Sequence, residues 1–136
     1  MEEVGVEALA EILSVSTQGL GPAVQLLDVR EQWEFDTARL PGFTLRPLSE
    51  LSEWCVRAWR SLLTHVRPCL STRLRRANTL TTDFDRDKAT YLLCHHGVRS
   101  RQAASFLLFA GFTKVYNVTG GIDAFTRRVD PSIPAY

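Results

Sequence analysis

The sequence predicts an α/β fold, with an open, mostly parallel sheet and helices on both of its faces. Short apolar runs that fit buried strands alternate along the chain with segments whose apolar residues recur at helical spacing. This alternation is typical of parallel strands joined by crossover helices. In the clearest unit, the apolar run from Thr90 to Leu93 ends at Cys94, and a polar loop containing Gly97 follows. A helical pattern then begins at Arg101.

Size and composition indicate one domain in a reducing compartment. The chain has 136 residues and a formal net charge of +1, so it carries no overall field that favours nucleic acid. An odd number of cysteines without a secretory signal argues against a disulfide framework; they are Cys55, Cys69 and Cys94. No run is long enough for a transmembrane helix, and the acidic N-terminus carries no signal or transit peptide. We therefore expect a soluble, intracellular monomer without membrane contact.

The remaining elements follow from the same periodicities. Before the central unit we expect a helix from Val6 to Leu13, a loop from Ser14 to Pro22, a strand from Ala23 to Val29, a helix from Glu31 to Thr37, a strand from Phe43 to Leu45, and a helix that starts at Ser49 and is ended by Pro68. After it we expect a strand from Lys114 to Val118, a helix from Ile122 to Arg127, and an extended tail from Asp130 to Tyr136. Four side chains are expected in the core: Trp33, Trp54, Trp59 and Cys55.

A basic segment interrupts this pattern. Between Trp54 and Thr82 there are six arginines and no acid: Arg57, Arg60, Arg67, Arg73, Arg75 and Arg76. One interpretation is a patch for an anionic partner, such as RNA or an acidic protein. The other is a solvated surface insertion, which we favour because aromatic residues do not alternate with the arginines.

Cys94 is the candidate nucleophile. The thiolate is the reactive form of cysteine, and a helix N-terminus or a nearby positive charge favours it. Amides of residues 95–100 are able to form a concave nest, Gly97 permits a left-handed backbone there, and Arg99 adds a full charge. A cysteine at the end of a strand is usually a small buried apolar residue. The polar loop and the arginine favour the catalytic interpretation instead.

Asp28 and Arg30 lie at the end of the preceding strand. They either orient the cysteine loop or act structurally, as an ion pair or a cap of the next helix. We favour the structural role.

Several motifs resemble one family. The loop Cys94-His95-His96-Gly97-Val98-Arg99-Ser100 resembles the active-site loop of rhodanese-type sulfurtransferases. Residues 26–35 and 38–42 are similar to that family's early signatures, and residues 115–134 resemble the single-domain rhodaneses of cyanobacteria and plastids. The resemblance implies a five-stranded sheet and a single rhodanese-like domain over residues 1–136, with a basic surface insertion at about 64–87. It also implies a plastid stroma location in a photosynthetic eukaryote, and a cytoplasmic one otherwise.

The resemblance implies a thiosulfate sulfurtransferase that needs no cofactor. Cys94 would take a sulfane sulfur from thiosulfate or another persulfide donor and pass it to a thiol or cyanide. The substrate-binding loop would be His95, His96, Gly97, Val98, Arg99 and Ser100, with Asp28 and Arg30 in support. Arg99 would attract the anionic donor, and Cys69 could resolve the persulfide. An acidic protein could bind the Arg57–Arg76 segment. The spacing of Cys94, His95 and His96 fits no zinc pattern, so we expect no metal.

Two other functions remain open at this point. A cysteine phosphatase or arsenate reductase of the related type has five residues between cysteine and arginine, whereas four separate Cys94 from Arg99. The shorter loop suits a single sulfur atom better than a tetrahedral phosphate. A non-catalytic docking module would more readily lack the cysteine, which is present here.

Overall fold

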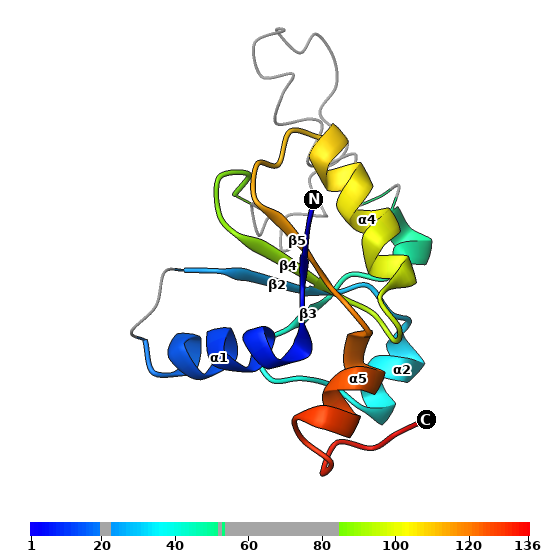
Figure 1. Cartoon of the computed structure of the whole chain (residues 1–136). Helices are drawn as coiled ribbons and strands as arrows, with labels where there is room; N and C mark the ends of the chain where they lie inside the picture. The colour runs from blue at the N-terminus through cyan, green and yellow to red at the C-terminus, as the bar shows by residue number, and fades with distance from the viewer. Residues whose placement is uncertain (20–22, 52, 54–84) are drawn as a thin grey trace, which may run out of the picture.

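The fold is a five-stranded parallel sheet, seen in a computed structural model that describes residues 1–19, 23–51, 53 and 85–136 (Figure 1). The strands are β1 (Glu2–Val4), β2 (Gln25–Asp28), β3 (Thr44–Leu45), β4 (Thr90–Leu93) and β5 (Val115–Val118), in the order β1-β5-β4-β2-β3. All four pairings between neighbouring strands are parallel. The described helices are α1 (Val6–Thr17), α2 (Gln32–Thr37), α4 (Val98–Phe109) and α5 (Gly121–Arg128). The predicted fold class is confirmed.

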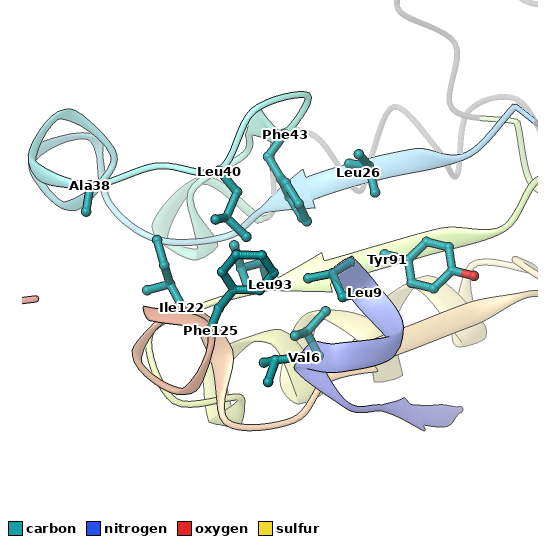
Figure 2. Close-up of a cluster of buried hydrophobic side chains, with 11 residues drawn as sticks. Val6, Leu9, Leu26, Ala38, Leu40, Phe43, Tyr91, Leu93, Ile122 and Phe125 are labelled. Carbon is teal, nitrogen blue, oxygen red and sulfur yellow. The ribbon is translucent and has the colours of Figure 1, made fainter. Parts of the chain in front are cut away.

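Helices cover both faces of the sheet because successive strand residues point to opposite sides. Leu26 and Leu93 pack on one face with side chains of α1 and α5, in the cluster drawn in Figure 2. Leu27 and Leu92 pack on the other face against α4. Each fully buried leucine stabilises the fold by roughly 1.5–3 kcal/mol. The central strand β4 is therefore buried on both sides, and Cys94 follows directly after it.

Three elements differ from the sequence predictions by more than two residues. The edge strand β1 was not predicted, because its three residues Glu2–Val4 are mostly polar and exposed. The first helix continues past Leu13 to Thr17, so the loop predicted from Ser14 is wrong over residues 14–17. The Ser14 and Thr17 hydroxyls donate to carbonyls of the preceding helical turn, so these residues are compatible with a helix. The helix after Cys94 begins at Val98 rather than Arg101. Its first turn was missed because residues 98–100 do not show the spacing of apolar residues that identifies a helix.

The core prediction for Trp33 is also wrong. This side chain is 63% exposed and lies on the outer side of the short helix α2. It contacts the ring of Tyr136 edge-on, with centroids 5.9 Å apart. Helical spacing identified the helix but not the face that is buried.

Part of the predicted chain lies outside the described residues. The start of the helix predicted at Ser49 is a 3-10 turn at Leu48–Glu50. Most of that helix, most of the basic insertion at 64–87, and the residues Cys55, Cys69, Trp54 and Trp59 are not among those described. The proposals for an acidic partner and for Cys69 therefore stay predictions. Within the described ranges, no helix is long and apolar enough to cross a membrane.

Candidate active site

Cys94 lies at the carboxyl end of the central strand, in the crevice where open parallel sheets bind ligands. It is only 1% exposed. The backbone N–H of Gly97 donates to its sulfur at 3.0 Å, and the Ser100 hydroxyl oxygen lies 3.3 Å from the same atom. The sulfur therefore sits at the N-terminus of α4, where helix amides and the macrodipole favour negative charge.

Gly97 shapes the loop as predicted. Its φ is +93°, a left-handed conformation that disfavours residues with a Cβ. A Cβ here would also lie 3.1 Å from the Gly120 nitrogen and the Val118 oxygen. The turn after Cys94 is thus folded tightly against the end of β5.

The start of α5 holds the cysteine loop from the other side. Backbone N–H groups of Ile122 and Asp123 donate to the carbonyls of Cys94 and His95, at 2.9 and 3.1 Å. A Cβ on Gly121 would lie 2.3 Å from both carbonyl oxygens, so a residue larger than glycine would displace the loop. The sequence predicts the helix from Ile122, but the contact of its first turn with the cysteine loop has no local signal.

Arg99 is paired with a residue that the sequence analysis missed. Its two terminal nitrogens donate to the two carboxylate oxygens of Glu34, both at 2.6 Å. Burial would raise the pKa of Glu34, but hydrogen bonds from Arg99 and from the Glu31 backbone outweigh it and lower that pKa to about 2. The signal in the sequence is the spacing of Glu31 and Glu34, which form a capping box at the start of α2.

Asp28 and Arg30 form a buried ion pair, which is one of the roles expected for them from the sequence. The Arg30 Nη2 and Asp28 Oδ2 atoms are 2.6 Å apart, and both side chains are fully buried. The remaining N–H groups of Arg30 donate to the Ala38 and Glu34 carbonyls and to the Tyr136 hydroxyl. Glu31, not this pair, caps the next helix. Arg30 therefore supports the segment that carries Glu34.

Three stacked rings lie beside the cysteine loop. His95 stacks on His96 with centroids 4.1 Å apart, and on Tyr136 at 4.5 Å. Burial, with help from His96, lowers the pKa of His95, so its ring is neutral at neutral pH. His96 is exposed and lies 3.9 Å from an Asp123 oxygen. Val98 is 65% exposed, so His96 and Val98 lie on the solvent side of the loop.

Ser100 leads to two further residues that the sequence analysis did not identify. It donates to Asn117 Oδ1 of β5, and Asn117 Nδ2 donates to a carboxylate oxygen of Glu3 in β1. Ser100 and Asn117 are fully buried. Asn117 could have been identified from the sequence, because it is a polar residue within the otherwise apolar strand Val115–Val118.

These features define a class of protein: a parallel α/β domain that presents one cysteine on a glycine-containing loop between a central strand and its following helix. Residues 17–128 match the family described as "Rhodanese-like domain", and the chain belongs to that family. The family resemblance of the motifs is confirmed.

Individual relatives agree with this assignment. The chain is 39% identical over 112 residues to "Rhodanese-like/PpiC domain-containing protein 12, chloroplastic" of Arabidopsis thaliana, covering 82% of the chain and 30% of that protein. It is 41% identical over 54 residues to "Thiosulfate sulfurtransferase GlpE" of Actinobacillus pleuropneumoniae, covering 40% of the chain and 50% of that protein. The chain thus matches half or less of the length of these two curated relatives.

A solved structure supports the fold alone. The rhodanese-like domain protein of Staphylococcus aureus has a TM-score of 0.65 at 20% identity, and the match covers 100% of this chain and 99% of that one.

Proposed function

We propose that this domain is a sulfurtransferase that carries a sulfane sulfur on Cys94. The Cys94 thiolate attacks the outer sulfur of thiosulfate, the S–S bond of the donor breaks, and sulfite leaves with the electron pair. A thiolate or cyanide then attacks the outer sulfur of the Cys94 persulfide and releases the Cys94 thiolate. This is covalent catalysis in two steps, and it needs no cofactor.

One observation supports this proposal most strongly: the sulfur of Cys94 accepts the Gly97 N–H at 3.0 Å, at the N-terminus of α4. This position favours an anionic sulfur, whether thiolate or persulfide. Because Cys94 is only 1% exposed, a small donor fits the site better than a bulky one.

The relatives guide the choice of donor and compartment. GlpE is named a thiosulfate sulfurtransferase, and we adopt thiosulfate as the donor to test first. The Arabidopsis relative is named chloroplastic, which favours the plastid for this domain if it comes from a photosynthetic eukaryote. The choice of thiosulfate as donor and that of the plastid as compartment are both proposals, because the chain covers at most half of either relative.

The site is poorly suited to the phosphatase alternative. Phosphate recognition is favoured by a guanidinium whose charge is not already paired with a carboxylate. Two of the five N–H groups of Arg99 donate to Glu34, whose carboxylate balances its charge, and the position after Arg99 is the neutral Ser100. The same pairing means that Arg99 acts on a donor through its position in the wall of the site rather than as an uncompensated charge.

The first test is thiocyanate formation from thiosulfate and cyanide by the wild-type protein and Cys94→Ser. We expect the variant to lose all turnover, because its hydroxyl is not ionised at neutral pH and holds no sulfane sulfur. Intact mass after thiosulfate alone should rise by about one sulfur atom in the wild type only. Circular dichroism checks that the variant is folded. Turnover in folded Cys94→Ser would contradict the proposal.

A further inference from the structure

A chain of hydrogen bonds connects the sulfur of Cys94 to the edge strand β1. The Ser100 oxygen lies 3.3 Å from the sulfur, and its hydroxyl donates to Asn117 Oδ1 at 2.5 Å. Asn117 Nδ2 donates to Glu3 Oε2 at 2.9 Å. The chain crosses from α4 through β5 to β1, and its two inner members are fully buried.

The carboxylate at the outer end fixes the direction of these bonds. A hydrogen bond from Thr119 lowers the pKa of Glu3 against the effect of burial, with further help from Asn117 and Arg101, so Glu3 is ionised and only accepts. Asn117 must therefore turn its NH₂ toward Glu3 and its carbonyl toward Ser100. Ser100 has a single proton and gives it to that carbonyl.

The sulfur consequently faces a lone pair of Ser100. A protonated Cys94 satisfies this lone pair by donating its S–H, whereas a thiolate faces it without a proton between the two atoms. To hydrogen-bond a thiolate, Ser100 would have to leave the Asn117 carbonyl unpaired in a buried site, which is unfavourable.

We propose that Asn117 and Glu3 are positioning residues that orient the Ser100 proton away from the sulfur and thereby oppose the Gly97 N–H and the N-terminus of α4, which favour the thiolate of Cys94. This inference deepens the proposed function, since it concerns the protonation of the same sulfur. The edge strand, which contributes few residues to the core, then controls how readily the sulfur becomes a nucleophile.

Other charges also act on Cys94 and must stay constant in a test. The titratable and charged groups on the elements around it include Arg99 and Arg101 of α4, Glu34 of α2, His95 and His96 of the loop, Asp123 of α5, Tyr136, and the Asp28–Arg30 pair. Among these groups, only Arg101 bonds to Glu3 in the described contacts, so Glu3→Gln removes its ion pair and leaves the other groups in place. The Ser100→Ala background described below detects any direct effect of that lost pair on the sulfur.

The test is the pH–rate profile of Cys94 alkylation by iodoacetamide in Glu3→Gln, with the adduct at Cys94 quantified by peptide mapping. Glutamine has the same shape but can donate, so Asn117 is free to turn and Ser100 to donate to the sulfur. We expect the midpoint of the profile to fall by about 0.5–1 pH unit, or roughly a three- to tenfold faster reaction below both midpoints. An unchanged midpoint would overturn the inference.

Two controls separate proton direction from simple loss of charge. Thr119→Val removes another hydrogen bond to Glu3 but keeps the carboxylate, so its midpoint should match the wild type. In a Ser100→Ala background, Glu3→Gln should cause no further shift, because no hydroxyl remains to reorient. A shift of equal size in that background would mean a direct charge effect and would refute the role of Asn117 and Ser100.

The same variants distinguish this inference from the proposed function. Alkylation reports the sulfur without any transfer reaction. A shifted profile in a protein that forms no thiocyanate supports the positioning role and defeats the sulfurtransferase proposal. Thiocyanate formation with an unshifted profile supports the sulfurtransferase proposal and defeats the positioning role of Asn117 and Glu3.

Discussion

Arg99 and Ser100 are neighbours in sequence, yet they belong to two networks of different chemistry. Arg99 enters a charged network through Glu34, which continues through the Tyr136 hydroxyl to Arg30 and Asp28. It ties the first turn of α4 to α2 and to the end of β2.

Ser100 enters the chain through Asn117 to Glu3. Its inner links are neutral, and the charged pair of Glu3 and Arg101 lies at the outer end, where the Glu3 side chain is 41% exposed. It ties the same turn of α4 to β5 and β1.

Because one network consists of charged groups and the other mainly of neutral ones, we expect the first to control the stability of the fold and the second the reactivity of Cys94. Buried charges tolerate no rearrangement, because an unpaired one is costly, so the Arg99 side fixes the loop. Neutral hydroxyl and amide groups reverse a hydrogen bond by rotating, so the direction of the bonds on the Ser100 side depends on the Glu3 carboxylate and changes when that charge is removed. Variants on the charged side should therefore change the free energy of unfolding, and variants on the neutral side the pH profile of Cys94.

The largest loss of stability is expected for Asp28→Asn. It leaves the guanidinium of Arg30 without its carboxylate in a fully buried position. Breaking one partner of such a pair costs about 3–5 kcal/mol. Urea unfolding measures the change, and Glu7→Gln, which removes the exposed pair with Arg128, should leave the midpoint unchanged. Equal effects of the two substitutions would contradict the role assigned to the charged network.

The sequence predicted the central strand, the loop and the charged pair because each is a local feature. Cys94 ends an apolar run, Gly97 lies in a polar turn, and Asp28 and Arg30 are two residues apart. Periodicity and residue type are sufficient to locate features of this kind.

The partners of the loop were missed because they come from distant parts of the chain. Glu34 is 65 residues from Arg99, and Glu3 is 114 residues from Asn117. Strand β1 has no apolar run, since an edge strand with three residues needs none to pair with β5. Such contacts follow from the strand order, which the sequence pattern alone does not determine.

The next largest loss of stability is expected for Glu34→Gln, and its size depends on pH. The pKa of Glu34 is about 2 in the folded protein and ordinarily 4.5, so its charge stabilises the fold fully above pH 4.5. The difference of about 2.5 pH units corresponds to about 3 kcal/mol, which is lost progressively as pH falls from 4.5 to 2.

Urea unfolding at pH 7, 5, 4 and 3 tests this expectation. Wild type and Glu34→Gln should differ most at pH 5 and above, and most of that difference should be gone at pH 3. Glu11→Gln, an exposed position of α1, controls for general acid effects and should show no such trend. A difference that stays constant from pH 7 to pH 3 would mean that the carboxylate is not what stabilises the site.

The smallest effect is expected for Tyr136→Phe. The substitution removes the bond from Arg30 Nη1 at 2.6 Å and the bond to Glu34 Oε1 at 3.1 Å, but it keeps the ring stacked on His95. The loss should be about 1 kcal/mol, because Arg30 still donates to the Glu34 carbonyl and Glu34 keeps Arg99. Tyr136→Leu removes the ring as well and should cost more. Tyr136→Phe should not move the pH–rate profile of Cys94 alkylation, because it keeps the ring on His95 and leaves the bonds of Ser100 unchanged. A shift in Tyr136→Phe as large as that in Glu3→Gln would show that the two networks act as one, and that stability and reactivity are not separated in this site.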